Sequence, residues 1–141
     1  MKVSNFAVMR FVNTAVNKGH VFPGIKGYEP YESGHNPWAH AWDYAVATGL
    51  GYAEGVAYLN NTWRAHAWCV TEDGAVIEVR DGFGDATEYR GWQMDTNAVA
   101  AVLLTTGQPL THSFLCAALN TGKDHWKQVL DRFAFIPGTA L

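Results

Sequence analysis

Apolar residues recur at helical spacing near the beginning of the chain, and this pattern predicts a helix over residues 4–18. Ser4 stands where an N-cap is expected, and Gly19 follows the pattern as a stop signal. The predicted apolar stripe of this helix consists of Phe6, Met9, Val12 and Val16. Residues 20–35 are rich in glycine, proline and tyrosine, so we expect a long loop there.

A second helix is predicted over residues 36–48. Asn36 suits the N-cap and Pro37 the first helical position, while Gly49 marks the end. The apolar stripe expected for this helix consists of Trp38, Ala41, Trp42, Ala45 and Val46.

Strand-like patterns follow the second helix. Residues 51–59 predict a strand that ends at the turn Asn60-Asn61, and residues 63–71 and 75–80 predict a hairpin, followed by a loop over 81–85. The last third of the chain is expected to be mostly helical, with an apolar run at 97–104 and helices over 111–119 and 124–133. The last of these helices would carry an apolar face made of Trp126, Val129, Leu130 and Phe133.

The predicted hairpin places a histidine on one strand and a carboxylate on the next. Alternation along the first strand puts His66 and Trp68 on one face. A three-residue loop over 72–74, with Gly74 in the left-handed conformation, brings Glu78 diagonal to His66 and within reach of it. A two-residue turn would instead move Glu78 to the other face and bring Asp81 opposite His66. The sequence favours Glu78 and leaves Asp81 as the alternative.

Composition and charge limit the function classes. The 141 residues are 48% hydrophobic and are expected to form one domain, 1–141. The net charge is −3 and no run of like charges occurs, which argues against nucleic-acid binding. No apolar stretch approaches about 18 residues, so no membrane span is expected. The first residues of the chain lack the pattern of a signal peptide, so we expect the protein to be located in the cytoplasm. Cys69 and Cys116 form no spaced pair and are expected to be buried thiols.

The segment His66-Ala67-Trp68, followed by a turn with Asp73-Gly74 and by Glu78, resembles the His–Asp hairpin of transglutaminase-like and papain-like folds. The chain is similar to a group of small uncharacterised proteins, many from bacteriophages and actinobacteria. In that group a helix that begins with Cys is followed by a Tyr-Val-Glu-Gly-Tyr-Ala-like strand, the His-Ala-Trp hairpin and a Tyr-x-Gly motif. The corresponding segments here are 52–57, 66–68 and 89–91, so the resemblance covers residues 36–92.

The resemblance implies an α+β fold with a small antiparallel sheet packed on a central helix. It also implies a catalytic pair in which the carboxylate of Glu78 holds one imidazole nitrogen of His66 and leaves the other free to move a proton. Glu78 stands where the group has Asp. The nucleophile position falls at the start of the second helix, near Asn36, and holds no Cys. Cys69 cannot easily replace it, because three residues along a strand place it on the face opposite His66.

Other residues are candidates for the same site. Ser33 is a possible nucleophile with His66 as its base, and Asn36, His40, Glu54 and Trp68 are candidate binding residues. Three histidines with a carboxylate are able to bind Zn²⁺. However, no tight metal motif is present, so neither a metal nor another cofactor is expected.

Three functions remain open at this point. The first is a catalytically degenerate transglutaminase-like or papain-like domain that binds a ligand or a protein partner. The second is an active hydrolase or acyl or amide transferase that uses His66 and Glu78 with Ser33 or a bound water. The third is a phage-encoded interaction protein that acts on a host component in the host cytoplasm. Because the thiol is missing, the sequence leans towards a protein without enzymatic activity.

Overall fold

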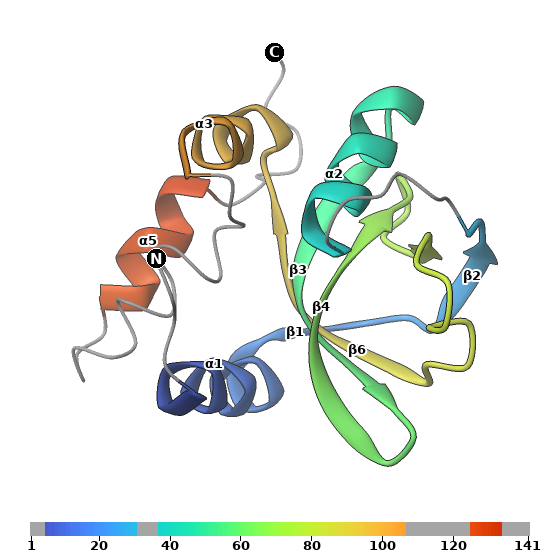
Figure 1. The fold of residues 1–141 in the computed structure, drawn as a ribbon, viewed down its shortest axis with the longest axis horizontal. Helices are drawn as coiled ribbons and strands as arrows, with labels where there is room; N and C mark the ends of the chain where they lie inside the picture. The colour runs from blue at the N-terminus through green and yellow to red at the C-terminus, as the bar shows by residue number, and fades with distance from the viewer. Residues whose placement is uncertain (1–4, 31–36, 107–124, 134–141) are drawn as a thin grey trace.

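A computed structural model describes residues 5–30, 37–106 and 125–133 of the chain. The fold is α+β, with a curled six-stranded sheet and several helices (Figure 1). The elements in chain order are α1 (Asn5–Lys18), β1 (His20–Phe22), β2 (Ile25–Tyr28), α2 (Pro37–Thr48), β3 (Gly51–Leu59), β4 (Thr62–Val70), β5 (Val76–Glu78), β6 (Glu88–Met94), α3 (Thr96–Thr106) and α5 (His125–Phe133).

The order of the strands shows that the sheet curls back on itself. The order is β1-β6-β3-β4-β5-β2, with antiparallel pairs except for the parallel pair β2–β5. The two edge strands β1 and β2 are joined by only Pro23 and Gly24. A connection of this length spans at most about 11 Å, so the end of β1 must lie close to the start of β2, on the other edge of the sheet (Figure 1).

Two predictions about these strands were wrong. The small antiparallel sheet is in fact a six-stranded sheet with one parallel pair. The loop expected over 20–35 contains β1 and β2, and residues 31–36 lie outside the described part. Both strands are three or four residues long and pair on one side only. Such short edge strands tolerate neighbouring Gly and Pro. These residues led to the prediction of a loop in this segment.

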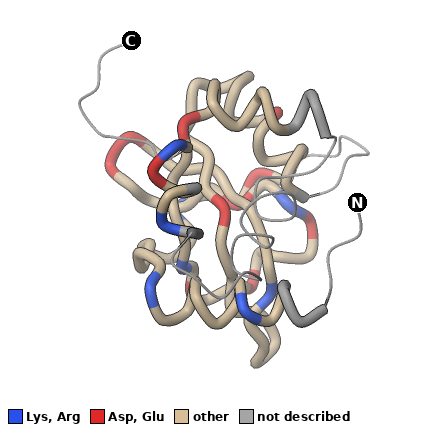
Figure 2. The backbone as a smooth tube through the Cα atoms, turned by 90° about the vertical axis from the view of Figure 1, so that its left-hand side faces the viewer, with Lys and Arg blue, Asp and Glu red and all other residues tan. Residues whose placement is uncertain are grey.

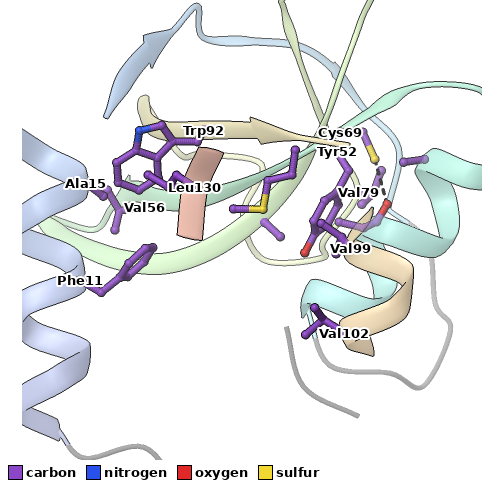
Figure 3. Close-up of a cluster of buried hydrophobic side chains, with 14 residues drawn as sticks. Phe11, Ala15, Tyr52, Val56, Cys69, Val79, Trp92, Val99, Val102 and Leu130 are labelled. Carbon is purple, nitrogen blue, oxygen red and sulfur yellow. Dashed lines mark hydrogen bonds between the residues drawn. The ribbon is translucent and has the colours of Figure 1, made fainter. Parts of the chain in front are cut away.

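The core has two parts, on the two faces of the sheet. On the outer face, residues of α1, α2, α3 and α5 pack against alternate residues of the strands (Figure 3). On the inner face, a second buried cluster draws on all six strands and on the β5–β6 loop. Its residues are Phe22, Ala53, Ala57, Trp68, Val70, Val76, Ala86 and Tyr89, with Ile25 and Phe83 packed beside them. No described helix contributes to this inner cluster, so the curled sheet itself excludes water from it.

The first two predicted helices form as α1 and α2, but the residues that they bury differ in part from the predicted apolar stripes. In α1 the buried residues are Phe11 and Ala15, whereas Met9 is 63% exposed. In α2 the residues Ala41 and Ala45 are buried as expected, while Val46 is 54% exposed. The glycine after α2 has a φ of 77°, as a C-terminal stop requires. The side chains of Phe6, Trp126 and Val129 lie outside the description.

The remaining elements agree closely with the sequence, with one omission. Strands β3, β4 and β5 and helices α3 and α5 lie where they were predicted, within a few residues at their ends. The helix expected over 111–119 lies outside the described residues. Strand β6 was not foreseen, because Arg90, Gly91 and Gln93 break its apolar alternation. Within the described ranges, no helix has both the length and the apolar character that crossing a membrane requires.

Candidate functional site

The register of the β4–β5 hairpin decides which carboxylate meets His66. Val70 pairs with Val76 and Cys69 with Ile77, and the backbone N–H of Thr71 donates to the carbonyl of Ala75 at 2.9 Å. This is the three-residue loop, and Gly74 has the expected positive φ of 87°. This register confirms the prediction that Glu78, and not Asp81, lies beside His66. Asp81 instead accepts a hydrogen bond from the hydroxyl of Tyr28.

Glu78 lies at the centre of a buried hydrogen-bonded cluster. Nε2 of His66 lies 3.0 Å from both carboxylate oxygens. The hydroxyl of Tyr89 donates to Oε1 at 2.6 Å, and the backbone N–H of Arg80 donates to Oε2 at 2.9 Å. His66, Glu78 and Tyr89 are each 0% exposed. We call these three side chains the His–Glu–Tyr cluster.

This cluster reaches across the interior of the curled sheet. His66 belongs to β4, Glu78 to β5 and Tyr89 to β6, and the order of strands places β3 and β4 between β6 and β5. In a flat sheet, strands with two others between them would be about 14 Å apart. The 2.6 Å contact between Tyr89 and Glu78 is therefore possible only because the sheet curls.

The hydrogen bonds of the cluster show which ring nitrogen of His66 faces Glu78. An ionised carboxylate only accepts, so an ionised Glu78 requires Nε2 of His66 to be the donor of this hydrogen bond. The other ring nitrogen, Nδ1, has no hydrogen-bond partner among the described residues. Burial and the charge of Glu78 raise the pKa of Tyr89, which keeps its hydroxyl protonated as a donor.

Aromatic rings enclose the imidazole. The ring of Phe83, from the β5–β6 loop, stacks on His66 with centroids 3.8 Å apart and an angle of 4° between the planes. Trp68 lies on the same face of β4, with its ring centroid 6.4 Å from that of His66. Phe22 and Tyr89 in turn meet Trp68 edge-on. The candidate catalytic histidine is thus sealed inside an aromatic cluster.

The helix that the resemblance associates with the nucleophile lies on the other face of β4. Helix α2 packs against Ala67 and Cys69, whereas His66 and Trp68 point into the sheet. Successive side chains of a strand point to opposite faces, so His66 does not share a face with α2. The expected arrangement, with the imidazole facing the start of that helix, is not found. Ser33 and Asn36 lie outside the described residues.

Two candidate binding residues also lie away from the cluster. Glu54 is 0% exposed and accepts a hydrogen bond of 2.7 Å from Tyr52, on the face that carries α2. Burial and the charge of Glu54 raise the pKa of Tyr52 well above its ordinary value. His40 is buried in α2, where its Nε2 donates to the carbonyl of Val79 at 2.7 Å. Glu54 lies on the opposite face of the sheet from His66, because side chains alternate along a strand, and His40 belongs to the helix that covers that opposite face.

Cys69 lies on the face opposite His66, as the sequence predicted. Its thiol donates to the carbonyl of Ala41 in α2 at 3.3 Å (Figure 3). Burial, together with the charge of Glu78, raises the pKa of Cys69 to about 12. Because the thiolate is the reactive form, this cysteine is unsuited to nucleophilic catalysis at neutral pH.

Metal ligation finds no support in the described ranges, where no group of three His, Cys, Asp or Glu side chains is arranged to hold an ion. The Nε2 atoms of His40 and His66 are engaged with Val79 and Glu78, on opposite faces of the sheet. Charged residues of both signs are interspersed along the described backbone (Figure 2).

Sequence reasoning missed Tyr89 and Phe83. Tyr89 belongs to the Tyr-Arg-Gly segment that contributed to the resemblance, but its hydroxyl was not connected to Glu78. In the same segment Gly91 pairs directly with Gly55, which in turn pairs with His66. The motifs on β3, β4 and β6 therefore meet at one place in the sheet.

Comparison of the chain with protein-family models, curated proteins and solved structures gives no match in any of the three.

Proposed function

We propose that this chain is a catalytically inactive domain that binds a ligand or a protein partner without turnover, and that its likeness to transglutaminase-like and papain-like folds is limited to the His66–Glu78 hairpin. The observation that carries the proposal is the complete burial of His66 and Glu78 inside the curled sheet. A general base must come within about 3 Å of the proton that it removes, or reach it through one water. A substrate cannot approach a ring that is 0% exposed and stacked under Phe83.

The hydrogen bonds that Glu78 accepts give the His–Glu–Tyr cluster a structural role. Glu78 accepts hydrogen bonds from β4, from β6 and from the backbone that follows β5. A buried carboxylate is stable only when its oxygens are matched by donors. Matched in this way, Glu78 holds strands from different parts of the sheet in one closed arrangement, and no reaction is needed to explain the cluster.

One observation favours the alternative of an active hydrolase or acyl transferase. Nδ1 of His66 has no partner among the described residues, and the other ring nitrogen is held by a carboxylate. This is the arrangement that a general base requires. The alternative would need the β5–β6 loop to move Phe83 away from the ring.

Turnover assays separate the two functions. The purified chain would be tested with p-nitrophenyl acetate, with a peptide amide, and with a glutamine peptide plus a fluorescent amine. We expect rates equal to those of buffer for the wild type and for His66→Gln. His20→Gln is the matched control, because His20 is exposed on β1. A wild-type rate above buffer that His66→Gln abolishes and His20→Gln preserves would show that the proposal is wrong.

A further inference from the structure

The β3–β4 hairpin extends away from α2 and α3 at its turn (Figure 1). Close to this turn, two aromatic residues pair across the strands, Tyr58 on β3 and Trp63 on β4. Both side chains are half-buried, and their ring centroids lie 5.0 Å apart with an angle of 58° between the planes. Trp63 packs against the cluster that contains the helices, so this pair of rings lies on the outer face of the sheet.

Arg90 of β6 is held in place beside these rings. Its guanidinium carbon lies 5.3 Å from the centroid of a Trp63 ring, which is a cation–π contact. Nε donates to Glu88 at 2.8 Å, and Nη1 donates to the backbone carbonyl of Val16 in α1 at 2.7 Å. These bonds use two of the five N–H groups, and the side chain is 30% exposed, so donors remain available to a partner. A guanidinium that is already oriented loses little further freedom when it binds.

An exposed apolar residue adjoins Arg90 on the edge strand. Val21 of β1 pairs with Arg90, and residues that are directly opposite each other in a sheet project to the same face. The side chain of Val21 is 66% exposed. Aromatic residues and arginine are enriched in the parts of protein surfaces that contribute most to binding. We call Val21, Tyr58, Trp63 and Arg90 the Trp–Arg patch.

The charges at the Trp–Arg patch indicate the kind of partner. Lys18 is exposed at the end of α1, two residues after the carbonyl that Arg90 binds. The carboxylate of Glu88 is engaged by Arg90, so the positive charge of Lys18 remains unmatched by these groups. The planar guanidinium presents parallel N–H donors to a carboxylate. A segment that carries a carboxylate beside an apolar side chain would therefore complement the patch in both charge and polarity.

We propose that the Trp–Arg patch binds a protein partner through an acidic segment, in which an apolar or aromatic residue stands next to a carboxylate. The carboxylate lies against Arg90, and the apolar residue covers Val21 and Trp63. This inference rests on the proposed function, because it assigns a surface and a partner class to a domain that binds without turnover. The patch lies on the face opposite His66, so binding here does not require the inner cluster to open.

Selection of binders to the full chain from a random library of displayed dodecapeptides tests the proposal. We expect the selected peptides to be enriched in Asp and Glu next to aromatic or aliphatic residues, and their affinity, measured by fluorescence polarisation, to fall as salt is added. Arg90→Gln should weaken this binding about tenfold, the effect of a lost hydrogen bond to a charged group. Arg64→Gln is the matched control, because it removes the same charge from an exposed position whose side chain projects to the opposite face.

Two substitutions of Val21 keep the test valid if Arg90→Gln does not fold. Val21 is exposed on a short edge strand, so the fold tolerates polar side chains there. Val21→Glu puts a negative charge beside Arg90 and should abolish binding of the acidic peptides. Val21→Lys is equally polar but adds a positive charge, and should preserve or strengthen the binding.

Several results would overturn the proposal. They are an absence of binding peptides, selected peptides that are basic or neutral, equal effects of Arg90→Gln and Arg64→Gln, and equal effects of Val21→Glu and Val21→Lys. A dimer that analytical ultracentrifugation detects and that Val21→Glu dissociates would assign the patch to a second copy of the chain instead. The turnover assays do not involve this patch, so a wrong partner class is distinguishable from a wrong function.

Discussion

At the scale of single residues, Glu78 connects parts of the chain that are distant in sequence. Its oxygens accept from a histidine twelve residues before it and from a tyrosine eleven residues after it. The sequence allowed the first partner to be predicted, because hairpin register follows from loop length. It did not allow the second, because Tyr89 reaches Glu78 only across the interior of the curled sheet. Spacing along a chain does not encode such a contact.

The carboxylate of Glu78 is expected to be essential for stability. Replacing it with Gln puts an amide N–H₂ among groups that themselves donate, so the loss should be about 3 kcal/mol in the free energy of unfolding. Urea denaturation measures this value. Glu72→Gln, on the exposed loop of the same hairpin, is the matched control and should change stability by less than about 0.5 kcal/mol. Equal effects of the two substitutions would contradict the role assigned to the cluster.

The buried thiol predicts how stability depends on alkaline pH. The pKa of Cys69 rises from an ordinary value of 9.0 to about 12 on folding. Between these values the folded state keeps a proton that the unfolded chain loses, so stability is complete below pH 9 and falls as the pH rises towards 12. One such group contributes about 1.4 kcal/mol per pH unit. Tyr52 and Tyr89, whose pKa values are also raised, add to the loss above pH 10.

Urea denaturation at a series of pH values checks this dependence. Cys69→Ala should flatten the decline between pH 9 and 10, where the tyrosines contribute little. The native thiol should also resist iodoacetamide at pH 8 and react once the chain is unfolded. A Cys69 that is alkylated in the folded protein at the rate of a free thiol would contradict its placement.

At the scale of elements, the close pairing of β3 with β6 depends on two glycines that face each other. A Cβ on Gly55 would lie 2.2 Å from the carbonyl oxygen of Arg90, and one on Gly91 would lie 2.3 Å from that of Glu54. These contacts are with backbone, which cannot move aside. The helices and the central strands could be predicted because they follow a regular period. Strand β6 and the edge strands could not, since close backbone approach and curvature shape them more than apolar alternation does.

Adding a methyl group at this pairing should therefore be costly. Gly55→Ala is expected to lower the free energy of unfolding by about 2–3 kcal/mol, as overpacking does in a tight interior. Gly24→Ala is the control, because a Cβ there meets nothing within 4 Å. Thermal denaturation of the two variants compares them directly. A Gly55→Ala variant as stable as Gly24→Ala would show that β3 and β6 are not so closely paired.

At the scale of the whole molecule, the curled sheet determines what the hairpin can do. One face carries the helices, and the other closes around an aromatic interior that every strand helps to form. The resemblance drew attention to His66 and Glu78, and the structure joins these two side chains by a hydrogen bond. It also implied that the imidazole faces the start of α2, whereas the structure places them on opposite faces of β4. Whether a histidine points into a cleft or into a closed sheet depends on curvature, which the hairpin sequence does not specify.

The central claim is that His66 is sealed inside the folded protein, and its reaction with diethyl pyrocarbonate tests this most directly. Mass spectrometry of the modified peptides gives a rate for each histidine, while circular dichroism confirms that the chain stays folded. We predict rapid modification of His20, which is exposed, and no modification of His66 until denaturant is added. Modification of His66 at the rate of His20 in the folded protein would show that His66 is accessible, and would support the active-enzyme alternative.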